Sequence, residues 1–202
     1  MNKQIIISIS REYGSGGHEI GRKLAEKLDV EFFDRNLLEE IANVRNVDTN
    51  TLRKYDEKPR NPFLSRTVRG YSNSPEQNIA EMQFTLLKHK AADEDSFVIL
   101  GRCSDEIFTG IADVIKIFVR GDLDTKVKRV MEKRGMDARE AVKTIERHDK
   151  KRRAYHDYFC HSKWGEASSY DLCIDSGKLG IDGTVDFIED FVRSYLKKRD
   201  GE

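Results

Sequence analysis

Residues 10–21 read Ser10-Arg11-Glu12-Tyr13-Gly14-Ser15-Gly16-Gly17-His18-Glu19-Ile20-Gly21. The apolar run from Gln4 to Ile9 before them predicts a β-strand, and Ile20, Leu24 and Leu28 recur at helical spacing after them. Glycines without Cβ let successive backbone N–H groups converge on one anion at the positive end of the helix dipole. The stretch therefore predicts a phosphate site made by Gly14, Ser15, Gly16, Gly17 and His18.

The same stretch lacks the lysine of the usual phosphate loop. The pattern G-x-x-x-x-G-K-[ST] requires glycine at position 11 and lysine at position 17, where this chain has Arg11 and Gly17. A guanidinium group can form two parallel hydrogen bonds to phosphate oxygens. Arg11 is therefore the first candidate to replace the lysine, followed by His18 and by the arginines of a basic segment near the C-terminal third.

Two other interpretations of the stretch stay open. Gly14 and Gly16 begin the dinucleotide fingerprint G-x-G-x-x-G, although its third glycine would fall at Glu19. Asp34, at the end of the next predicted strand, would suit a ribose-binding acid. Alternatively, the glycines form only a strand-to-helix turn that packs the helix and binds nothing.

The balance of charge excludes several classes of partner. The chain has 202 residues, with 36 Lys and Arg against 36 Asp and Glu, and therefore no formal net charge at pH 7. Without an overall positive field we expect neither nucleic acid nor an anionic membrane as a partner. The apolar runs are too short to cross a bilayer, and Met1-Asn2-Lys3 precedes the first of them without a signal-peptide cleavage pattern. These features predict a cytoplasmic protein.

Cysteine and histidine usage points to a reduced, metal-free protein. Cys103, Cys160 and Cys173 form no CxxC pair and leave one thiol over in any pairing, which is typical of a reducing compartment. His156, Cys160 and His161 lie close in the sequence, but two ligand types without a second cluster are a weak signal for a metal. We therefore predict no metal site formed by the protein alone.

Short apolar runs alternate with longer amphipathic segments, which predicts an α/β fold with a parallel sheet and crossover helices. Asp137 followed by Glu140 resembles a capping box and predicts the start of a helix that becomes strongly basic. Residues 56–73 hold two prolines and four cations and predict a surface loop or small insert. The five predicted strands are residues 4–9, 30–33, 97–100, 114–119 and 172–174.

The basic segment contains Arg147, Lys150, Lys151, Arg152 and Arg153 within seven residues. Consecutive helical residues turn by about 100°, so some of these cations must face whatever the helix covers. Phosphoryl transfer needs aligned substrates and neutralised charge, which guanidinium groups provide. We interpret the run as part of a closing lid, with a solvated basic face as the alternative.

Several segments resemble, in their order along the chain, the cytidylate kinase-like family, a branch of the P-loop nucleoside monophosphate kinases. The resemblance implies a three-layer P-loop kinase fold, with a five-stranded parallel sheet flanked by helices and a helical lid, as one domain over residues 1–202. It implies an acceptor-side insert at about residues 35–95 and the lid at about residues 135–165. The segments are Ile7-Ser8-Ile9-Ser10-Arg11-Glu12-Tyr13-Gly14-Ser15-Gly16-Gly17, Phe32-Phe33-Asp34-Arg35, Ile99-Leu100-Gly101-Arg102, Ile145-Glu146-Arg147-His148-Asp149-Lys150-Lys151-Arg152 and Tyr170-Asp171-Leu172-Cys173-Ile174-Asp175.

The resemblance also implies roles for individual residues. Asp34 and Arg35 lie beside the acceptor, and Arg102 matches the Gly-Arg of the acceptor-site motif. A salt bridge from Arg102 to Asp34 or Asp105 is the alternative. Cys103 stands where cytidylate kinases have an aspartate that helps to read the cytosine ring. The predicted catalytic residues are Arg11, Arg147 and Arg152.

We expect a kinase that transfers the terminal phosphate of ATP, with Mg²⁺, to a nucleoside monophosphate such as CMP or to another small acceptor. The missing loop lysine leaves open a non-catalytic nucleotide-binding module that senses its ligand by lid closure. Asp34 and the two loop glycines leave open a dinucleotide-dependent enzyme.

Overall fold

A five-stranded parallel sheet forms the centre of the molecule. The computed structural model describes residues 4–34, 36–46, 48–58, 67–68, 71–72, 74–93 and 95–201. The strands follow the order β2-β5-β1-β6-β7, and each predicted strand is confirmed to within two residues at its ends. They are β1 (Ile6–Arg11), β2 (Glu31–Phe33), β5 (Phe97–Leu100), β6 (Val114–Arg120) and β7 (Leu172–Asp175).

The order of the strands separates β1 from β2. In the dinucleotide-binding fold the second strand lies directly beside the first. Here β5 pairs with β1 through Ile6–Phe97 and Ile9–Leu100, and β2 pairs with the far edge of β5. The strand that Asp34 follows, β2, is therefore separated from β1 by one intervening strand.

Both faces of the sheet are buried, which explains why β1 reads as a nearly continuous apolar run. Ile7 and Ile9 point to one face and pack with Ile20 and Leu24. Ile6 points to the other face, into a cluster around fully or almost fully buried phenylalanine and leucine side chains. That cluster contains Phe33, Leu37, Leu87, Phe97, Ile99 and Phe108.

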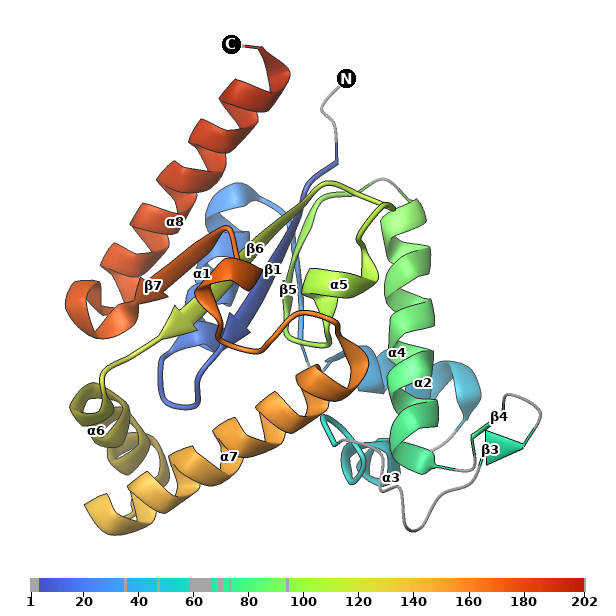
Figure 1. The fold of residues 1–202 in the computed structure, drawn as a ribbon, viewed down its shortest axis with the longest axis horizontal. Coiled ribbons are helices and arrows are strands. Elements are labelled where there is room, and N and C mark those ends of the chain that lie inside the picture. The colour runs from blue at the N-terminus through green and yellow to red at the C-terminus, as the bar shows by residue number, and fades with distance from the viewer. Residues whose placement is uncertain are drawn as a thin grey trace.

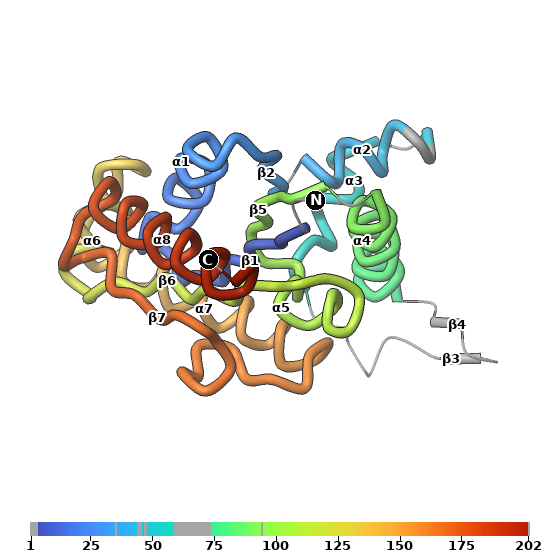
Figure 2. The backbone as a smooth tube through the Cα atoms, turned by 90° about the horizontal axis from the view of Figure 1, so that it is seen from above, coloured from blue at the N-terminus to red at the C-terminus, as the bar shows by residue number. Residues whose placement is uncertain are grey.

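Helices cover the two faces as the alternating pattern predicts. The first face carries α1 (Gly17–Leu28) and α8 (Ser176–Asp200), which pack against each other and are seen side by side from above (Figure 2). The second face carries α2 (Asn36–Arg45), α4 (Pro75–Ala92) and α5 (Ser104–Ile107). Figure 1 shows α8 and α4 on opposite sides of the sheet. The remaining short elements are α3 (Thr49–Arg53), the paired strands β3 (Thr67–Val68) and β4 (Tyr71–Ser72), and a 3-10 turn at Ala167–Ser169.

Two helices lie at the end of the sheet where the strands finish. α6 (Leu123–Arg134) follows β6, and α7 (Ala138–Phe159) runs across this end (Figure 1). The Asp137 carboxylate accepts a hydrogen bond of 2.8 Å from the backbone N–H of Glu140, so the predicted helix start is confirmed. None of the described helices is both long and apolar enough to cross a membrane.

The buried strand β6 gives a direct test of this architecture. Ile117 is 0% exposed in the centre of β6, whereas Ile111 on the surface is 51% exposed. We expect Ile117→Ala to lower the free energy of unfolding by about 2–5 kcal/mol, because it leaves a cavity against α1 and α8. The matched control Ile111→Ala removes the same atoms and is expected to change it by about 0.5 kcal/mol or less. Urea unfolding of both variants measures the difference, and equal losses would contradict the assignment of the core.

Candidate functional site

The glycine loop has the conformation that the sequence predicts. Gly14 and Gly16 adopt φ values of 82° and 81°, a left-handed conformation that other residues avoid. α1 begins immediately afterwards at Gly17. The amides of its first turn have no intrahelical acceptor by virtue of their position. The Gly17 amide donates a long hydrogen bond of 3.4 Å to the Ser15 hydroxyl, within the loop. An anion at the loop would lie at the positive end of the helix dipole.

Relative to the usual phosphate loop, Arg11 replaces a glycine and Gly17 replaces the lysine, and the two replacements fit together. A Cβ atom placed on Gly17 would lie 2.6 Å from the Cβ atom of Arg11, closer than side chains approach. The Arg11 side chain is buried and continues past the loop, where its Nη1 atom would lie 2.5 Å from a Cβ atom on Gly101. The arginine therefore occupies space beside the loop that a side chain at position 17 would need.

Three guanidinium groups meet two carboxylates next to the loop. Arg102 pairs with Asp56 at 2.9 Å and with Glu57 at 2.7 Å. Arg11 pairs with the same Glu57 oxygen at 3.3 Å. Arg152 lies 4.0 Å from the other Glu57 oxygen and donates a hydrogen bond of 3.2 Å to the backbone carbonyl of Arg11. The structure thus brings together Arg11, Arg102 and Arg152, which come from β1, the turn after β5 and α7.

This arginine cluster carries more positive than negative charge in a buried setting. Burial, and then the neighbouring Arg152 charge, lower the pKa of Arg11 to about 10, although Glu57 opposes the shift. Burial also disfavours the charged form of Arg102, but the carboxylates of Glu57 and Asp56 outweigh it and raise its pKa. Arg11 and Arg102 stay cationic at neutral pH, so an additional anion is favoured here.

Two buried hydrogen-bond donors near the cluster lack acceptors among the residues that the structure describes. They are the Arg102 Nε–H group and the Tyr155 hydroxyl. A buried donor without a partner costs free energy, so such groups often mark the place of a ligand or water. Both residues line one small pocket together with Ser10, Arg11, Glu57, Gly101, Cys103, Arg152, His156 and Trp164.

α7 is docked on the glycine loop. The Tyr13 backbone N–H donates a hydrogen bond of 2.6 Å to the Asp149 carboxylate, and the Tyr13 ring stacks on His148 at 4.2 Å. The Arg152 guanidinium lies 5.6 Å from the centre of the same ring. Burial, and then the charge of Arg152, lower the pKa of His148 to about 4, so it stacks as a neutral ring. One amide of the loop is therefore bound by a carboxylate of α7.

α6 also contacts the glycine loop. The Lys126 ammonium pairs with Glu12 at 2.9 Å, and the Arg129 guanidinium donates a hydrogen bond of 2.9 Å to the Ser15 carbonyl. The Glu12 carboxylate also accepts a hydrogen bond from the Gly121 backbone N–H at 3.2 Å. Lys126 is thereby held by Glu12 outside the loop and does not take the place of the missing lysine.

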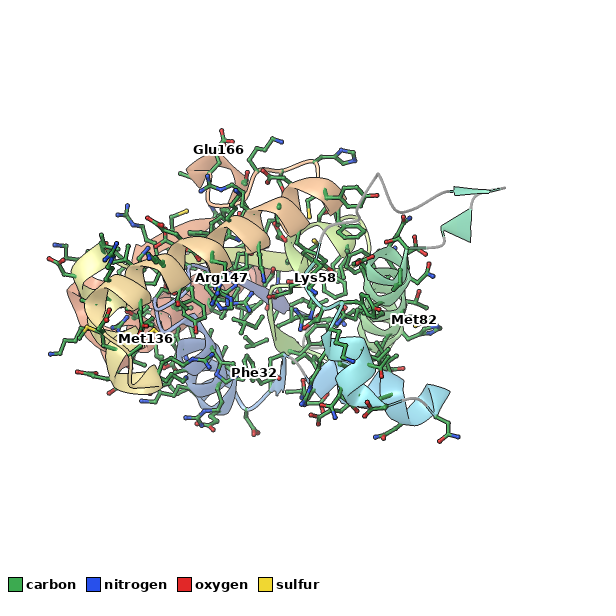
Figure 3. All side chains as sticks on the ribbon, turned by 90° about the horizontal axis from the view of Figure 1, so that it is seen from below. Phe32, Lys58, Met82, Met136, Arg147 and Glu166 are labelled. Atoms are coloured by element: carbon green, nitrogen blue, oxygen red, sulfur yellow. The ribbon has the colours of Figure 1, made fainter. Side chains whose placement is uncertain are left out.

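The remaining predicted site residues lie apart from the arginine cluster. His18 contacts Asp34 at 2.7 Å, and this hydrogen bond lowers the pKa of the Asp34 carboxyl. Arg147 is exposed on α7, and Figure 3 labels it in a view onto the end of the sheet where the strands finish. Arg35 lies outside the residues that the structure describes.

The acidic partners of the cluster were missed by the sequence analysis. Asp56 and Glu57 begin the segment predicted as a surface loop, yet their side chains are largely buried against Arg102, at 10% and 17% exposure. Asp34 or Asp105 was the alternative partner expected for Arg102. The structure instead pairs Arg102 with Asp56 and Glu57. The sequence signal that could have found them is the presence of two adjacent acids before a basic segment. The hydrogen bond between the Tyr13 amide and Asp149 was likewise not predicted.

A group of potential metal ligands lies behind the pocket. Atoms of Asp105, His156 and Cys160 all lie within 4.8 Å of one another, whereas His161 is exposed. The His156 Nε2 atom is only 2.7 Å from Asp105 Oδ2. Two atoms that share a metal at about 2 Å each lie farther apart than this. The geometry is that of a buried ion pair and offers no ready metal site.

Gly17 allows a test of the Arg11–Gly17 pairing. We expect Gly17→Ala to lower the free energy of unfolding by about 1–3 kcal/mol, because the new Cβ atom meets Arg11. Gly183→Ala in α8 is the matched control, since its Cβ atom would lie 3.4 Å from Leu179 Cβ and the change favours a helix. Urea unfolding measures both, and a Gly17→Ala variant as stable as the parent would contradict the close contact.

His156 predicts a pH dependence of stability. Burial opposes its protonation, but hydrogen bonds with Asp105 and Cys160 outweigh burial and raise its pKa to about 10. Because this lies above the ordinary value of 6.5, the ion pair stabilises the fold fully below about pH 6.5, and this contribution is lost as the pH rises toward 10. We expect the stability advantage of the parent over His156→Gln to shrink between pH 6 and pH 9, by at most about 1.4 kcal/mol per pH unit. Urea unfolding at both pH values measures it, and a constant difference would count against the ion pair.

Comparisons with known proteins show which proteins the whole chain is similar to. The chain is 25% identical over 196 residues to a cytidylate kinase of Staphylothermus marinus, covering 96% of this chain and 99% of that protein. It is 22% identical over 205 residues to a cytidylate kinase of Methanopyrus kandleri, covering 97% of each. A structure of an uncharacterised protein from Eubacterium ventriosum superposes with a TM-score of 0.75 at 37% identity, covering 95% of this chain and 99% of that one.

A shikimate kinase structure from Bacteroides thetaiotaomicron shares the fold at 16% identity, with a TM-score of 0.56 over 94% of this chain and 98% of that one. The family model described as the cytidylate kinase-like family matches residues 6–178, a range that includes the glycine loop, the arginine cluster and all of α7. The predicted fold class is confirmed, and the chain belongs to the cytidylate kinase-like family.

Proposed function

We propose that the protein is a P-loop kinase that transfers the terminal phosphate of ATP to a nucleoside monophosphate, CMP-like, or to another small anionic acceptor. The observation that carries the proposal is the arginine cluster of Arg11, Arg102 and Arg152 beside the glycine loop. The cluster lies where β1 and β5 finish, and open α/β sheets bind their ligands at the carboxyl ends of their strands.

The binding roles follow from which groups are free to meet an anion. The amides from Gly14 to His18 would hold the β-phosphate of ATP at the start of α1. Arg102 and the Tyr155 hydroxyl would offer their unused donors to the acceptor, in the pocket that both line. Asp34, held by His18, and the following Arg35 would flank the acceptor on the side of β2.

The catalytic roles fall to arginines that can reach between the two sites. Arg11 runs from the loop to the cluster and would take the place of the lysine. Arg152 would neutralise charge on the transferring group, and Arg147 would follow as residues 135–165 close as a lid. Phosphate binding at the Tyr13 amide would displace the Asp149 carboxylate, so ligand entry and the position of α7 would be coupled.

Mg²⁺ fits the oxygen donors around the loop. Mg²⁺ is usually held by one or two carboxylates, by water and by substrate phosphates. Asp34 and Asp149 both contact the loop or its helix and would supply such carboxylates. When bound with ATP, the ion would neutralise phosphate charge and polarise the transferring group.

A non-catalytic nucleotide-binding module is the second candidate function, because Gly17 stands in the place of the lysine. A dinucleotide-dependent enzyme is not favoured, since β5 lies between β1 and β2, whereas the dinucleotide-binding fold has its first two strands side by side. The two remaining candidates differ in one measurable respect, which is the formation of ADP and a phosphorylated acceptor.

Turnover with individual acceptors tests the proposal. Pure protein is incubated with ATP, Mg²⁺ and each nucleoside monophosphate, and ADP and the diphosphate product are quantified. We expect transfer to at least one acceptor, and Arg152→Ala is expected to lower kcat by about 10²-fold or more. Arg153→Ala is the matched control, because Arg153 lies next in α7 but its guanidinium is 5.4 Å from the Trp164 ring, outside the arginine cluster.

Two outcomes would contradict the proposal in different ways. Saturable binding of ATP by calorimetry without any transfer would favour the non-catalytic module. Equal activity of Arg152→Ala and Arg153→Ala would show that the cluster does not act on the transferring group.

A further inference from the structure

Two cysteines from distant parts of the sequence meet behind the arginine cluster. Cys103 follows Arg102 in the turn after β5, and Cys160 ends α7. Both side chains are buried, and they share one cluster with Ala80 and Tyr155. Their thiols form a hydrogen bond with each other. The third thiol, Cys173 in β7, is exposed.

A positive charge lies beside one of these thiols. His156 precedes Cys160 by one helical turn and forms the buried 2.7 Å ion pair with Asp105. The hydrogen bond from Cys103, assisted by His156, lowers the pKa of the Cys160 thiol against the opposing effect of burial. The same hydrogen bond and burial raise the pKa of the Cys103 thiol. Cys160 is therefore the more nucleophilic member of the pair, and Cys103 is its neutral neighbour.

The turn that carries Cys103 is held in an unusual conformation. Gly101, Arg102 and Cys103 have φ values of 73°, 63° and 55°. Such a conformation is uncommon for residues with side chains, and it persists only where surrounding contacts enforce it. Here it directs the buried Arg102 toward Asp56 and Glu57 and the Cys103 thiol toward Cys160.

One member of the thiol pair, Cys103, lines the pocket beside the arginine cluster. Cys103 and His156 both line this pocket, together with Arg102 and Arg152. A small uncharged oxidant that enters the pocket thus meets Cys103, which shares a buried cluster with Cys160, whereas bulky reagents are excluded by the small size of the pocket. Buried thiols without such a path are usually inert.

We propose that Cys103 and Cys160 are a modification site at which hydrogen peroxide forms a reversible intramolecular disulfide. In the first step the Cys160 thiolate attacks one peroxide oxygen, the O–O bond breaks, and the products are a sulfenic acid and, after protonation, water. In the second step the Cys103 sulfur attacks the Cys160 sulfur, the S–O bond breaks, and the hydroxyl group leaves as a second water with the Cys103 proton. Two thiols are oxidised by two electrons, and one peroxide is reduced.

The disulfide would connect two elements that carry the arginine cluster. Arg102 immediately precedes Cys103, and Arg152 lies two helical turns before Cys160 on α7. This consequence rests on the proposed function: the bond would hold the end of α7 against the acceptor turn and lower phosphoryl transfer by restricting the lid. The formation of the bond does not depend on that function.

Oxidation in a Cys173→Ser background tests the site, because that change removes the exposed thiol. Folded protein is treated with hydrogen peroxide, denatured in an alkylating reagent and examined by intact mass and peptide mapping. We expect the free thiols to fall from two per chain to none, the mass to fall by two hydrogens, and a peptide containing Cys103 to be linked to one containing Cys160. Dithiothreitol is expected to restore both thiols.

Matched variants separate this result from general oxidation. Cys103→Ser and Cys160→Ser, each combined with Cys173→Ser, are expected to form no intramolecular link, and Cys103→Ser should retain a sulfenic acid trapped by dimedone. Two free thiols after treatment of the folded Cys173→Ser protein would overturn the proposal, and so would a link found only between chains. Because the parental pair is tested in this background, a variant that fails to fold does not decide the outcome.

Two further measurements complete the experiment. The zinc content of the purified chain is measured first. One equivalent of zinc per chain, together with thiols that resist peroxide until a chelator is added, would overturn the proposal. That result would favour a metal site at Asp105, His156 and Cys160. Phosphoryl transfer is measured before and after oxidation. A disulfide that leaves transfer unchanged supports the modification site and excludes its effect on the lid, whereas absence of transfer in the reduced protein contradicts the proposed function alone.

Discussion

The candidate site depends on the ion pairs that the Glu57 carboxylate makes with its arginines. Its two carboxylate oxygens lie among the guanidinium groups of Arg11, Arg102 and Arg152, and Asp56 supplies the only other acidic partner that pairs with Arg102 among the described residues. Buried guanidinium groups without partners would be strongly destabilising, so the segment after α3 must turn inward to provide these carboxylates. Two carboxylates do not fully balance three cations. The same arrangement that stabilises the buried arginines therefore leaves the pocket beside them attractive to an anion.

α7 connects the separate parts of this site. Near its middle, Asp149 accepts the hydrogen bond from the Tyr13 amide and Arg152 reaches the arginine cluster, and at its end Cys160 meets Cys103. A displacement of α7 would therefore change the glycine loop, the cluster and the thiol pair together. α7 makes a small number of hydrogen bonds and ion pairs with these regions. The sheet, in contrast, is stabilised by large apolar clusters on both faces. Under the proposed function, α7 is the element whose position a charged ligand would change.

Because Arg11 stands in for a loop lysine, the positive charge reaches the site from a different element of the fold. A lysine at position 17 would extend from the first turn of α1 itself, whereas Arg11 reaches the cluster from the end of β1 and is held by Glu57. Its planar guanidinium has fixed donor directions and stays charged even with its lowered pKa of about 10. The charge therefore lies between the glycine loop and the pocket beside the arginine cluster, and it depends on the tertiary partners of Arg11.

The sequence alone determined the features that depend on short-range pattern. The five strands, the glycine loop between β1 and α1 and the Asp137 cap of α7 could be predicted because hydrophobic periodicity, glycine conformation and capping each act within a few residues. The fold class followed from the alternation of strands and helices, and the family from motifs in their order along the chain. The loop glycines, Arg11 and Arg102 all lie where parallel strands finish. Their place at one end of the sheet therefore follows from the positions of the predicted strands.

Only the tertiary structure decided which charged groups meet. Asp56 and Glu57 pair with Arg102, Asp149 binds the Tyr13 amide, Lys126 is taken by Glu12, and Cys103 meets Cys160. The sequence contains many acids and bases in equal number, so charge alone cannot select these partners. The selection comes from burial: the packing of α6 and α7 over the end of the sheet excludes water, and each charge brought there must be matched by whichever opposite group the fold places within reach.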